Sequence, residues 1–237
     1  MKSTLILALF VATFAHAAWN DYEEVRELRL DSQGIDVLDV KAAAGRLHIV
    51  GAPGARHVTV TATIVLPGVD HNKAAELIDR DLELSLVPDG NVLRLVARFD
   101  HGSWSVGDSP HVHLDIQVPP AMALRLDDGS GSLDVKGTTS AIAIEDGSGS
   151  ISLRDTGGPV SIDDGSGSIE LQNIAGDIHI VDGSGSIRVR DVQGSVSIDD
   201  GSGSIEVRKV SRDLIILNDG SGGIRYSDIQ GTVDDRS

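Results

Sequence analysis

The stretch Asp164-Gly165-Ser166-Gly167-Ser168-Ile169 is one of six nearly identical hexapeptides in this chain. The other copies begin at Asp128, Asp146, Asp182, Asp200 and Asp219. The first five copies start 18 residues apart, and the last follows after 19. A fixed period of this length is typical of repeat architectures, so the repeat decides the fold class.

Apolar residues occupy fixed places around each Asp: four and two residues before it, and five and seven residues after it. In the central copy these places hold Val160, Ile162, Ile169 and Leu171. A spacing of two within each pair, with many β-branched side chains, predicts β-strands. In the last copy the same places select Ile215, Leu217, Ile224 and Tyr226 as the inward-facing residues.

One such unit has no partner for its strands, whereas stacked units pair them and bury their flat ends. We therefore predict an all-β fold, a parallel β-solenoid (β-helix) with 18-residue coils. The extra residue of the last coil is predicted to form a bulge at Ser211–Asp213, which would keep Ile215 and Leu217 in register.

Residues 1–17 have the features of a secretory signal peptide. Lys2 supplies the positive start, Leu5–Phe14 is a short apolar core, and Ala15-His16-Ala17 fits the cleavage pattern. The apolar core is too short to span a bilayer, and no later segment is apolar enough to do so. The chain has no cysteine, and hence no disulfide framework. We expect an exported protein whose mature chain begins at Ala18 and has no transmembrane segment.

Residues 18–120 form a less regular β-rich region, which we expect to close one end of the solenoid. Strands are predicted at 25–30, 35–40, 46–50, 57–65, 82–87, 92–99 and 111–118, with one helix at 70–80 capped by Asp70. The repeats follow as residues 121–231. Residues 232–237 are predicted to be a charged tail, in which Asp234, Asp235 and Arg236 discourage edge-to-edge growth.

The formal net charge of the chain is −16 at pH 7. Nucleic acids and anionic lipid surfaces attract basic proteins, so the charge argues against both as partners. An acidic surface permits a cationic partner. The flat ends of a solenoid also offer a route to oligomers by end-stacking.

Several features outside the repeats point to a known family. They are the export signal, the segment Ala44-Gly45-Arg46-Leu47-His48-Ile49-Val50-Gly51 and the strand that ends at Val118-Pro119-Pro120. Together with the repeats, over about residues 25–230, they make the chain resemble the "putative adhesin" family of bacterial cell-envelope proteins, a domain of unknown function. The resemblance implies a β-solenoid at the cell envelope. No catalytic residues are established for that family, so none is transferred.

The first Asp of each repeat should form a column of carboxylates one coil apart. The column comprises Asp128, Asp146, Asp164, Asp182, Asp200 and Asp219. It would either hold a row of cations, with calcium as the candidate, or accept hydrogen bonds from the Gly and Ser amides of its own turns. Gly-Ser-Gly supplies free amides and permits positive φ, so we favour the turn interpretation and assign no metal or cofactor.

Serine and histidine offer weaker candidates. The serines equivalent to Ser166 would form a hydroxyl row, but sugar-binding faces usually carry aromatic platforms, and Tyr226 is the single aromatic of the repeats. His111 and His113 have the spacing of metal-binding strand residues, but this spacing is more often that of the solvent face of a strand whose other face is apolar. No Ser lies in the strand–turn–helix context of a hydrolase nucleophile.

The sequence therefore predicts an exported, non-catalytic structural or interaction protein of the bacterial envelope, adhesin-like, in the periplasm or at the cell surface. One alternative is a calcium-dependent binding protein whose repeats order on the ion. A second is a polysaccharide-active enzyme, since acidic residues abound. Calcium-dependent folding would favour the first alternative, and a groove with clustered aromatics and paired acids would favour the second.

Overall fold

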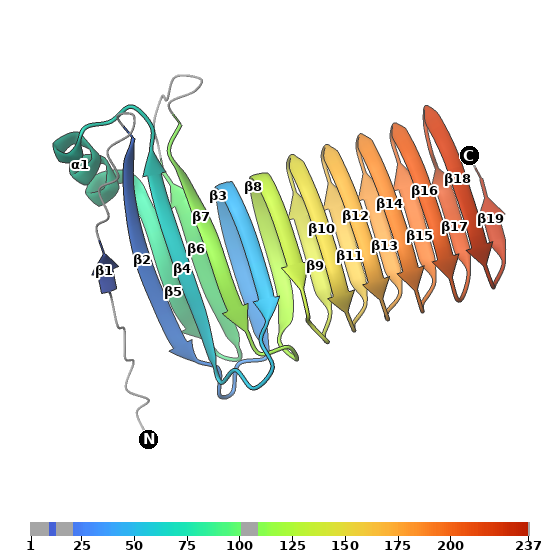
Figure 1. Ribbon diagram of the computed structural model, residues 1–237, viewed down its shortest axis with the longest axis horizontal. Helices are drawn as coiled ribbons and strands as arrows, with labels where there is room; N and C mark the ends of the chain where they lie inside the picture. The colour runs from blue at the N-terminus through green and yellow to red at the C-terminus, as the bar shows by residue number, and fades with distance from the viewer. Residues whose placement is uncertain (1–9, 13–20, 101–108, 237) are drawn as a thin grey trace.

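The computed structural model describes residues 10–12, 21–100 and 109–236. It is a rod of stacked β-coils, with helix α1 (His71–Asp81) at one end and the C-terminal strands at the other (Figure 1). Most of the predicted signal peptide lies outside the described residues. The strands are β1 (Phe10–Ala12), β2 (Tyr22–Asp31), β3 (Val37–Gly51), β4 (His57–Leu66), β5 (Leu82–Asp89), β6 (Val92–Phe99), β7 (His111–Val118), β8 (Ala123–Lys136), β9 (Ile142–Asp146), β10 (Gly149–Thr156), β11 (Val160–Asp164), β12 (Gly167–Ile174), β13 (Ile178–Asp182), β14 (Gly185–Val192), β15 (Val196–Asp200), β16 (Gly203–Val210), β17 (Leu214–Asn218), β18 (Gly222–Ile229) and β19 (Val233–Asp235).

Each repeat supplies one strand to each of two parallel faces. Face A contains β9, β11, β13, β15, β17 and β19, and face B contains β10, β12, β14, β16 and β18. Strand β8 runs through both faces, with its first half beside β9 and its second half beside β10. Ile151, Ile169 and Ile187 are paired in successive coils. The prediction of a parallel β-solenoid with 18-residue coils is confirmed.

The core is the space between the two faces. Strand alternation directs Val160 and Ile162 of face A and Ile169 and Leu171 of face B inward, and each is at most 2% exposed. Equivalent residues of neighbouring coils stack on them, so the rod has one continuous apolar core. Burial of this apolar area is the main stabilising contribution.

The last coil differs from the prediction. Leu214 and Ile216 are fully buried, whereas Leu217 is 37% exposed. The register shifts by one residue between Ile216 and Asn218. Leu217 is therefore the extra residue, and the predicted bulge at Ser211–Asp213 is wrong. Because the 18-residue offset between coils continues as far as Ile216, the side chains of Leu214 and Ile216 stay inside the rod. The bulge then turns only one apolar side chain, that of Leu217, toward solvent.

The solenoid begins earlier in the chain than the repeats do. Strand β3 pairs in parallel with β8 along nearly its whole length, with Leu38 opposite Leu124 and Ile49 opposite Val135. On its other side β3 pairs in parallel with β6 and β7. The two strands predicted at 35–40 and 46–50 are thus one strand. It forms a complete coil that lies between β6 and β7 on one side and β8 on the other, although all three follow it in sequence.

Antiparallel strands close the end of the rod near the N-terminus. Strands β2 and β4 continue face B beyond β7, and β5 continues face A beyond β6. Helix α1 lies at this end (Figure 1) and buries Ala74, Leu77 and Ile78. The Asp70 side chain accepts hydrogen bonds from the amides of residues 72 and 73, which confirms the predicted cap. No helix of the described residues is long and apolar enough to cross a bilayer.

At the opposite end of the rod, the described residues form no antiparallel closure of this kind. Residues 233–235, which the sequence places in a charged tail, form the short strand β19 beside β17. In the last coil Tyr226 is 47% exposed and Val233 is 38% exposed. Asp235 is paired with the buried Ile216, so a charged and exposed residue occupies this register position at the edge of face A. This placement opposes further growth of that edge.

Candidate functional site

Five aspartates form a column inside the rod. Four of them, Asp146, Asp164, Asp182 and Asp200, are the last residues of face A strands, and Asp128 ends the part of β8 that lies in face A. Each lies two residues after a buried apolar side chain. Strand alternation therefore turns the carboxyl groups toward the interior. Their exposed fractions are 3% for Asp128, 5% for Asp146, 1% for Asp164, 2% for Asp182 and 0% for Asp200.

One carboxylate oxygen in four of these residues has a hydrogen-bond donor in its own turn. The Ser amide two residues later donates to Oδ1 at 3.3 Å in Asp146, 3.1 Å in Asp164, 3.0 Å in Asp182 and 3.0 Å in Asp200. This is the Asx turn that the Asp-Gly-Ser segment favours. The turn hydrogen bonds expected from the sequence are therefore present.

The other oxygen has no such donor. Oδ2 of each of the five aspartates is buried and, within the described residues, has no hydrogen-bond partner. A buried ionised carboxylate without compensation is strongly unfavourable. The five orphaned acceptors are the most unusual polar feature of the described interior.

Burial and mutual repulsion shift the ionisation of the column. Burial, followed by repulsion from Asp146, raises the pKa of Asp128 to about 7 from an ordinary value of 3.8. Burial, followed by repulsion from Asp146 and Asp182, raises the pKa of Asp164 to about 6. Burial also raises the pKa values of Asp146, Asp182 and Asp200, while the amide hydrogen bonds of their turns act in the opposite direction.

The column stops at both ends of the repeat array. Ala42 of β3 is paired with Asp128, so an apolar residue takes the next place toward the capped end. At the other end Asp219 is partly exposed, and Oδ1 of Asn218 accepts the turn hydrogen bond from Gly220 at 3.1 Å. Asp219 therefore does not continue the buried column that the sequence suggested.

No group of three or more His, Cys, Asp or Glu side chains among the described residues has an arrangement suited to a metal ion. The rings of His111 and His113 lie 4.8 Å apart, but Nδ1 of His113 accepts a 2.9 Å hydrogen bond from the Arg46 amide. Burial, with repulsion from His111 and Arg46, lowers the pKa of His113. One ring nitrogen of His113 is thus already engaged by the backbone.

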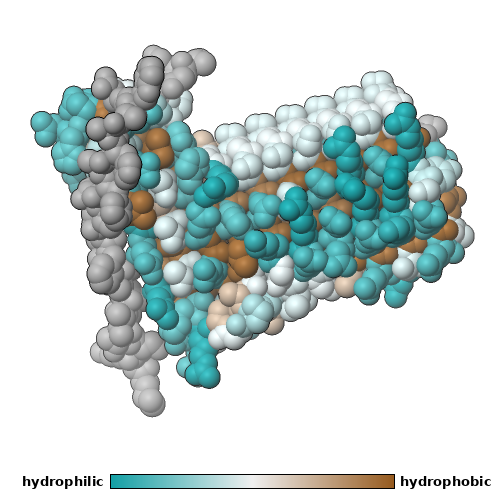
Figure 2. Space-filling view, viewed as in Figure 1, coloured by the Kyte–Doolittle hydropathy of each residue, from teal (hydrophilic) through white to brown (hydrophobic). Residues whose placement is uncertain are grey.

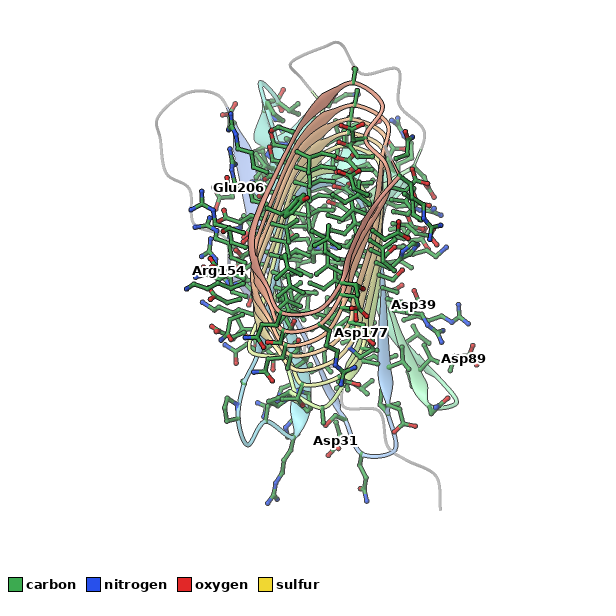
Figure 3. The ribbon with its side chains drawn as sticks, turned by 90° about the vertical axis from the view of Figure 1, so that its right-hand side faces the viewer. Asp31, Asp39, Asp89, Arg154, Asp177 and Glu206 are labelled. Atoms are coloured by element: carbon green, nitrogen blue, oxygen red, sulfur yellow. The ribbon has the colours of Figure 1, made fainter. Side chains whose placement is uncertain are left out.

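The outer surface of face B is crossed by rows of polar side chains, one residue per coil. Figure 3 shows Arg154 and Glu206 projecting on the side opposite to Asp39 and Asp89. The strands of face B, including the second half of β8, carry charges of both signs. Their basic residues are Lys136, Arg154, Arg188, Arg190, Arg208, Lys209 and Arg225, and their acidic residues are Asp134, Asp155, Glu170, Asp191, Glu206 and Asp228. The outer surface of face A instead presents the acidic residues Asp127, Glu145, Asp163 and Asp199, with Arg125 as the basic residue of that part of β8. The two broad sides of the rod therefore differ in charge.

The basic side chains of face B are only partly neutralised. Arg190 forms an ion pair with Glu170 at 2.9 Å, and Arg208 forms one with Glu206 at 2.6 Å. Among the described residues, Lys136 and Arg154 form no ion pair. A hollow of about 400 Å³ beside Arg154 is lined by polar residues. Figure 2 shows strongly hydrophilic side chains across this side, below a paler strip along one edge of the rod.

Sequence reasoning missed this asymmetry because it weighed total charge rather than the charge of each face. The signal was available in the residue eight places after the first Asp of each repeat, which is Lys136, Arg154, Gln172, Arg190, Arg208 and, in the last repeat, Ser227. That place faces outward on face B because strand residues alternate.

No family model and no curated protein matches the chain. A crystal structure of a "putative cell adhesion protein" from Clostridium sporogenes aligns with 91% of this chain and 100% of its own, at 10% identity and a TM-score of 0.36. A "putative adhesin" from Bacteroides fragilis aligns with 89% of this chain and 96% of its own, at 13% identity and a TM-score of 0.34. A "putative adhesin" from Parabacteroides distasonis has the same coverage, at 12% identity and a TM-score of 0.30. The chain is thus similar to bacterial structures described as adhesins, at a level that by itself assigns it neither a family nor a function.

Proposed function

We propose that the protein is an exported, non-catalytic interaction module of the bacterial envelope, with an adhesin-like role. The observation that carries this proposal is the outer surface of face B, where serine and charged side chains recur in most coils along a rod. Periodic side chains on a flat surface suit an extended partner, whereas small-molecule sites are concave and mostly apolar. Arg154 forms no ion pair among the described residues and lines the polar hollow on this face, so a negatively charged group of the partner would fit beside it.

The features of residues 1–17 support export, and with it a place in the periplasm or at the cell surface. An overall net charge of −16 opposes nonspecific adsorption to anionic surfaces. Binding through face B would therefore depend on the local arrangement of charges, and would weaken as salt concentration rises.

Charge reversal on face B tests the proposal. Arg154 is exposed on β10, so Arg154→Glu should weaken binding of the labelled protein to bacterial envelopes roughly tenfold, because like charges across an interface are costly. Arg125→Glu is the matched control, because Arg125 is an exposed strand residue on face A. Equal binding by the two variants would show that face B is not the docking surface.

Export and the absence of catalysis need separate tests. The full chain should be recovered from the periplasm or the cell surface, and a chain without residues 1–17 from the cytoplasm. Incubation with envelope polysaccharides should release no sugar. Sugar release that persists through purification, and disappears on substitution of one acidic pair, would instead establish the polysaccharide-active enzyme.

A further inference from the structure

The five buried aspartates require compensation that the hydrogen bonds of their turns provide only in part. Their side chains are at most 5% exposed, and each Oδ2 is buried without a hydrogen-bond partner in the described residues. Neighbouring strands of a sheet lie about 4.8 Å apart, so successive carboxyl groups stand too close for all of them to remain charged at low cost.

In the part of the chain that the structure describes, no buried basic side chain accompanies the column. Across the core, face B presents apolar side chains such as Ile151 and Ile169. The nearby charged groups on face A are also acidic, because Asp127, Asp163, Asp199 and Asp219 each repel a member of the column. Glu145 lies on the outer side of β9, in register with Asp127 and Asp163. Lys41 forms an exposed ion pair with Asp127 at 3.6 Å, on the outer surface of the rod. Among the described residues no Lys, Arg or His is buried.

A cation of the calcium type would need six to eight oxygen ligands around it. The described residues hold no cluster of three or more side chains arranged for a metal ion, and one oxygen in most of these carboxyls is already engaged by a Ser amide. A proton needs no further ligands and no additional space. It also removes the charge that makes each buried carboxylate costly.

We propose that the aspartate column is a proton-binding site, whose carboxyl groups take up protons from solvent as the chain folds and are held as neutral acids inside the rod. Each proton bonds to one carboxylate oxygen and removes one negative charge. The repeat, rather than any single residue, creates the site, because each added coil adds one interior carboxyl group.

The proposal links stability to pH in an uncommon direction. The folded pKa values lie above the ordinary 3.8, at about 7 for Asp128 and about 6 for Asp164, with the other three also raised. Between about pH 4 and pH 7 the folded protein therefore holds protons that the unfolded chain has released. Where the folded state binds more protons, stability falls as pH rises. Each such proton lowers the folding equilibrium constant about tenfold per pH unit.

Urea unfolding of the purified protein at pH 5, 6, 7 and 8 tests this directly. With at least two extra protons bound near pH 5, the folding constant should fall roughly 100-fold per pH unit there and less steeply toward pH 8. Asp164→Asn keeps the Oδ1 acceptor for Ser166 and removes the titrating group, so it should reduce the slope and raise the urea midpoint at pH 8. Asp155→Asn, at an exposed carboxylate on face B, is the control and should leave the slope unchanged.

A measurement without variants covers the case in which Asp164→Asn fails to fold. Side-chain carboxyl signals followed by NMR should show a set of aspartates that titrate well above pH 4 in the folded protein. Stability that is flat or rises between pH 5 and pH 7, or aspartates that all titrate near pH 4, would overturn the proposal. A large rise in melting temperature on adding calcium at pH 8, reversed by EDTA, would overturn it too, because a metal ion would then supply the compensating charge.

Discussion

The backbone amide of Ser166 donates a 3.1 Å hydrogen bond to Oδ1 of Asp164, two residues before it in the same turn. The same bond recurs in the turns at Asp146, Asp182 and Asp200. The turn therefore uses the serine backbone and the aspartate side chain. The Ser166 hydroxyl contributes no hydrogen bond within the described residues.

Ser166→Ala should consequently change the free energy of unfolding by no more than about 0.5 kcal/mol, because the amide donor remains. Ser166→Pro removes that donor and should cost at least about 1 kcal/mol by leaving Oδ1 of Asp164 unpaired. Urea unfolding monitored by circular dichroism compares the two variants. A large loss in the alanine variant would assign the hydroxyl a role that the turn geometry does not give it.

Ile162→Asp should unfold the repeats. Ile162 is 1% exposed and is stacked between Ile144 and Ile180 of the adjacent coils. Burying an unpaired charge there costs several kcal/mol, a large part of the stability of a domain. Ser161→Asp, on the exposed side of the same strand, is the control and should retain the β-type spectrum. A soluble Ile162→Asp variant with unchanged melting would be incompatible with the solenoid core.

Gly167→Ala should destabilise the protein by at least about 2 kcal/mol. The φ of Gly167 is +147°, and an added Cβ would lie 1.6 Å from the carbonyl oxygen of Gly149 in the preceding coil. Gly223→Ser is the matched comparison, because a Cβ at Gly223 meets nothing within 4 Å and Ser204 is the residue with which it is paired. That variant should melt within a few degrees of the parent protein.

Lys209→Asn should stabilise the protein by about 0.5–1 kcal/mol. Lys209 has a φ of +56°, in a left-handed conformation that Asn tolerates better than other non-glycine residues. The ion pair lost with Asp191 is exposed and therefore contributes little. Arg208→Asn, one residue earlier in ordinary strand conformation, should give no gain. The urea midpoints of the two variants provide the comparison.

Local periodicity was sufficient to predict the coils. The two-residue spacing around each Asp placed Val160, Ile162, Ile169 and Leu171 inside the rod, and all four are buried. The prediction succeeded because every repeat gives the same answer and one face of each strand has to be buried. The helix capped by Asp70 was predicted within one residue for a similar reason, since its cap and its apolar face are local.

The position of β3 could not be predicted from local pattern. Its placement between β7 and β8 depends on contacts between residues far apart in sequence, and no period links it to the repeats. A weak signal did exist, because the nine-residue spacing from Leu38 to Leu47 equals that from Leu124 to Leu133. Ala42 to Gly45 occupy the places of Asp128 to Gly131, but without the Asp and Ser the segment does not resemble a repeat.

The last coil was misassigned because Leu214 to Leu217 are four apolar residues in succession. Alternation then allows two registers that differ by one residue, and each turns a different pair inward. Pairing with β15 selects Leu214 and Ile216. The aspartate column was predicted in part. Its turn hydrogen bonds follow from the sequence, whereas the burial of each Oδ2 without a hydrogen-bond donor depends on the packing between coils.

The stacking of coils also determines how the rod responds to mechanical load. The hydrogen bonds between coils run along its long axis (Figure 1), from the antiparallel closure near β2 to β19 at the far end. A force applied between these ends therefore acts parallel to the hydrogen bonds between coils. We expect the coils to detach one at a time, beginning at the end that contains β19. Each released coil of 18 residues adds roughly 60 Å of extended chain. A molecule held at both ends would lengthen in steps under tension, while its closed end remained folded.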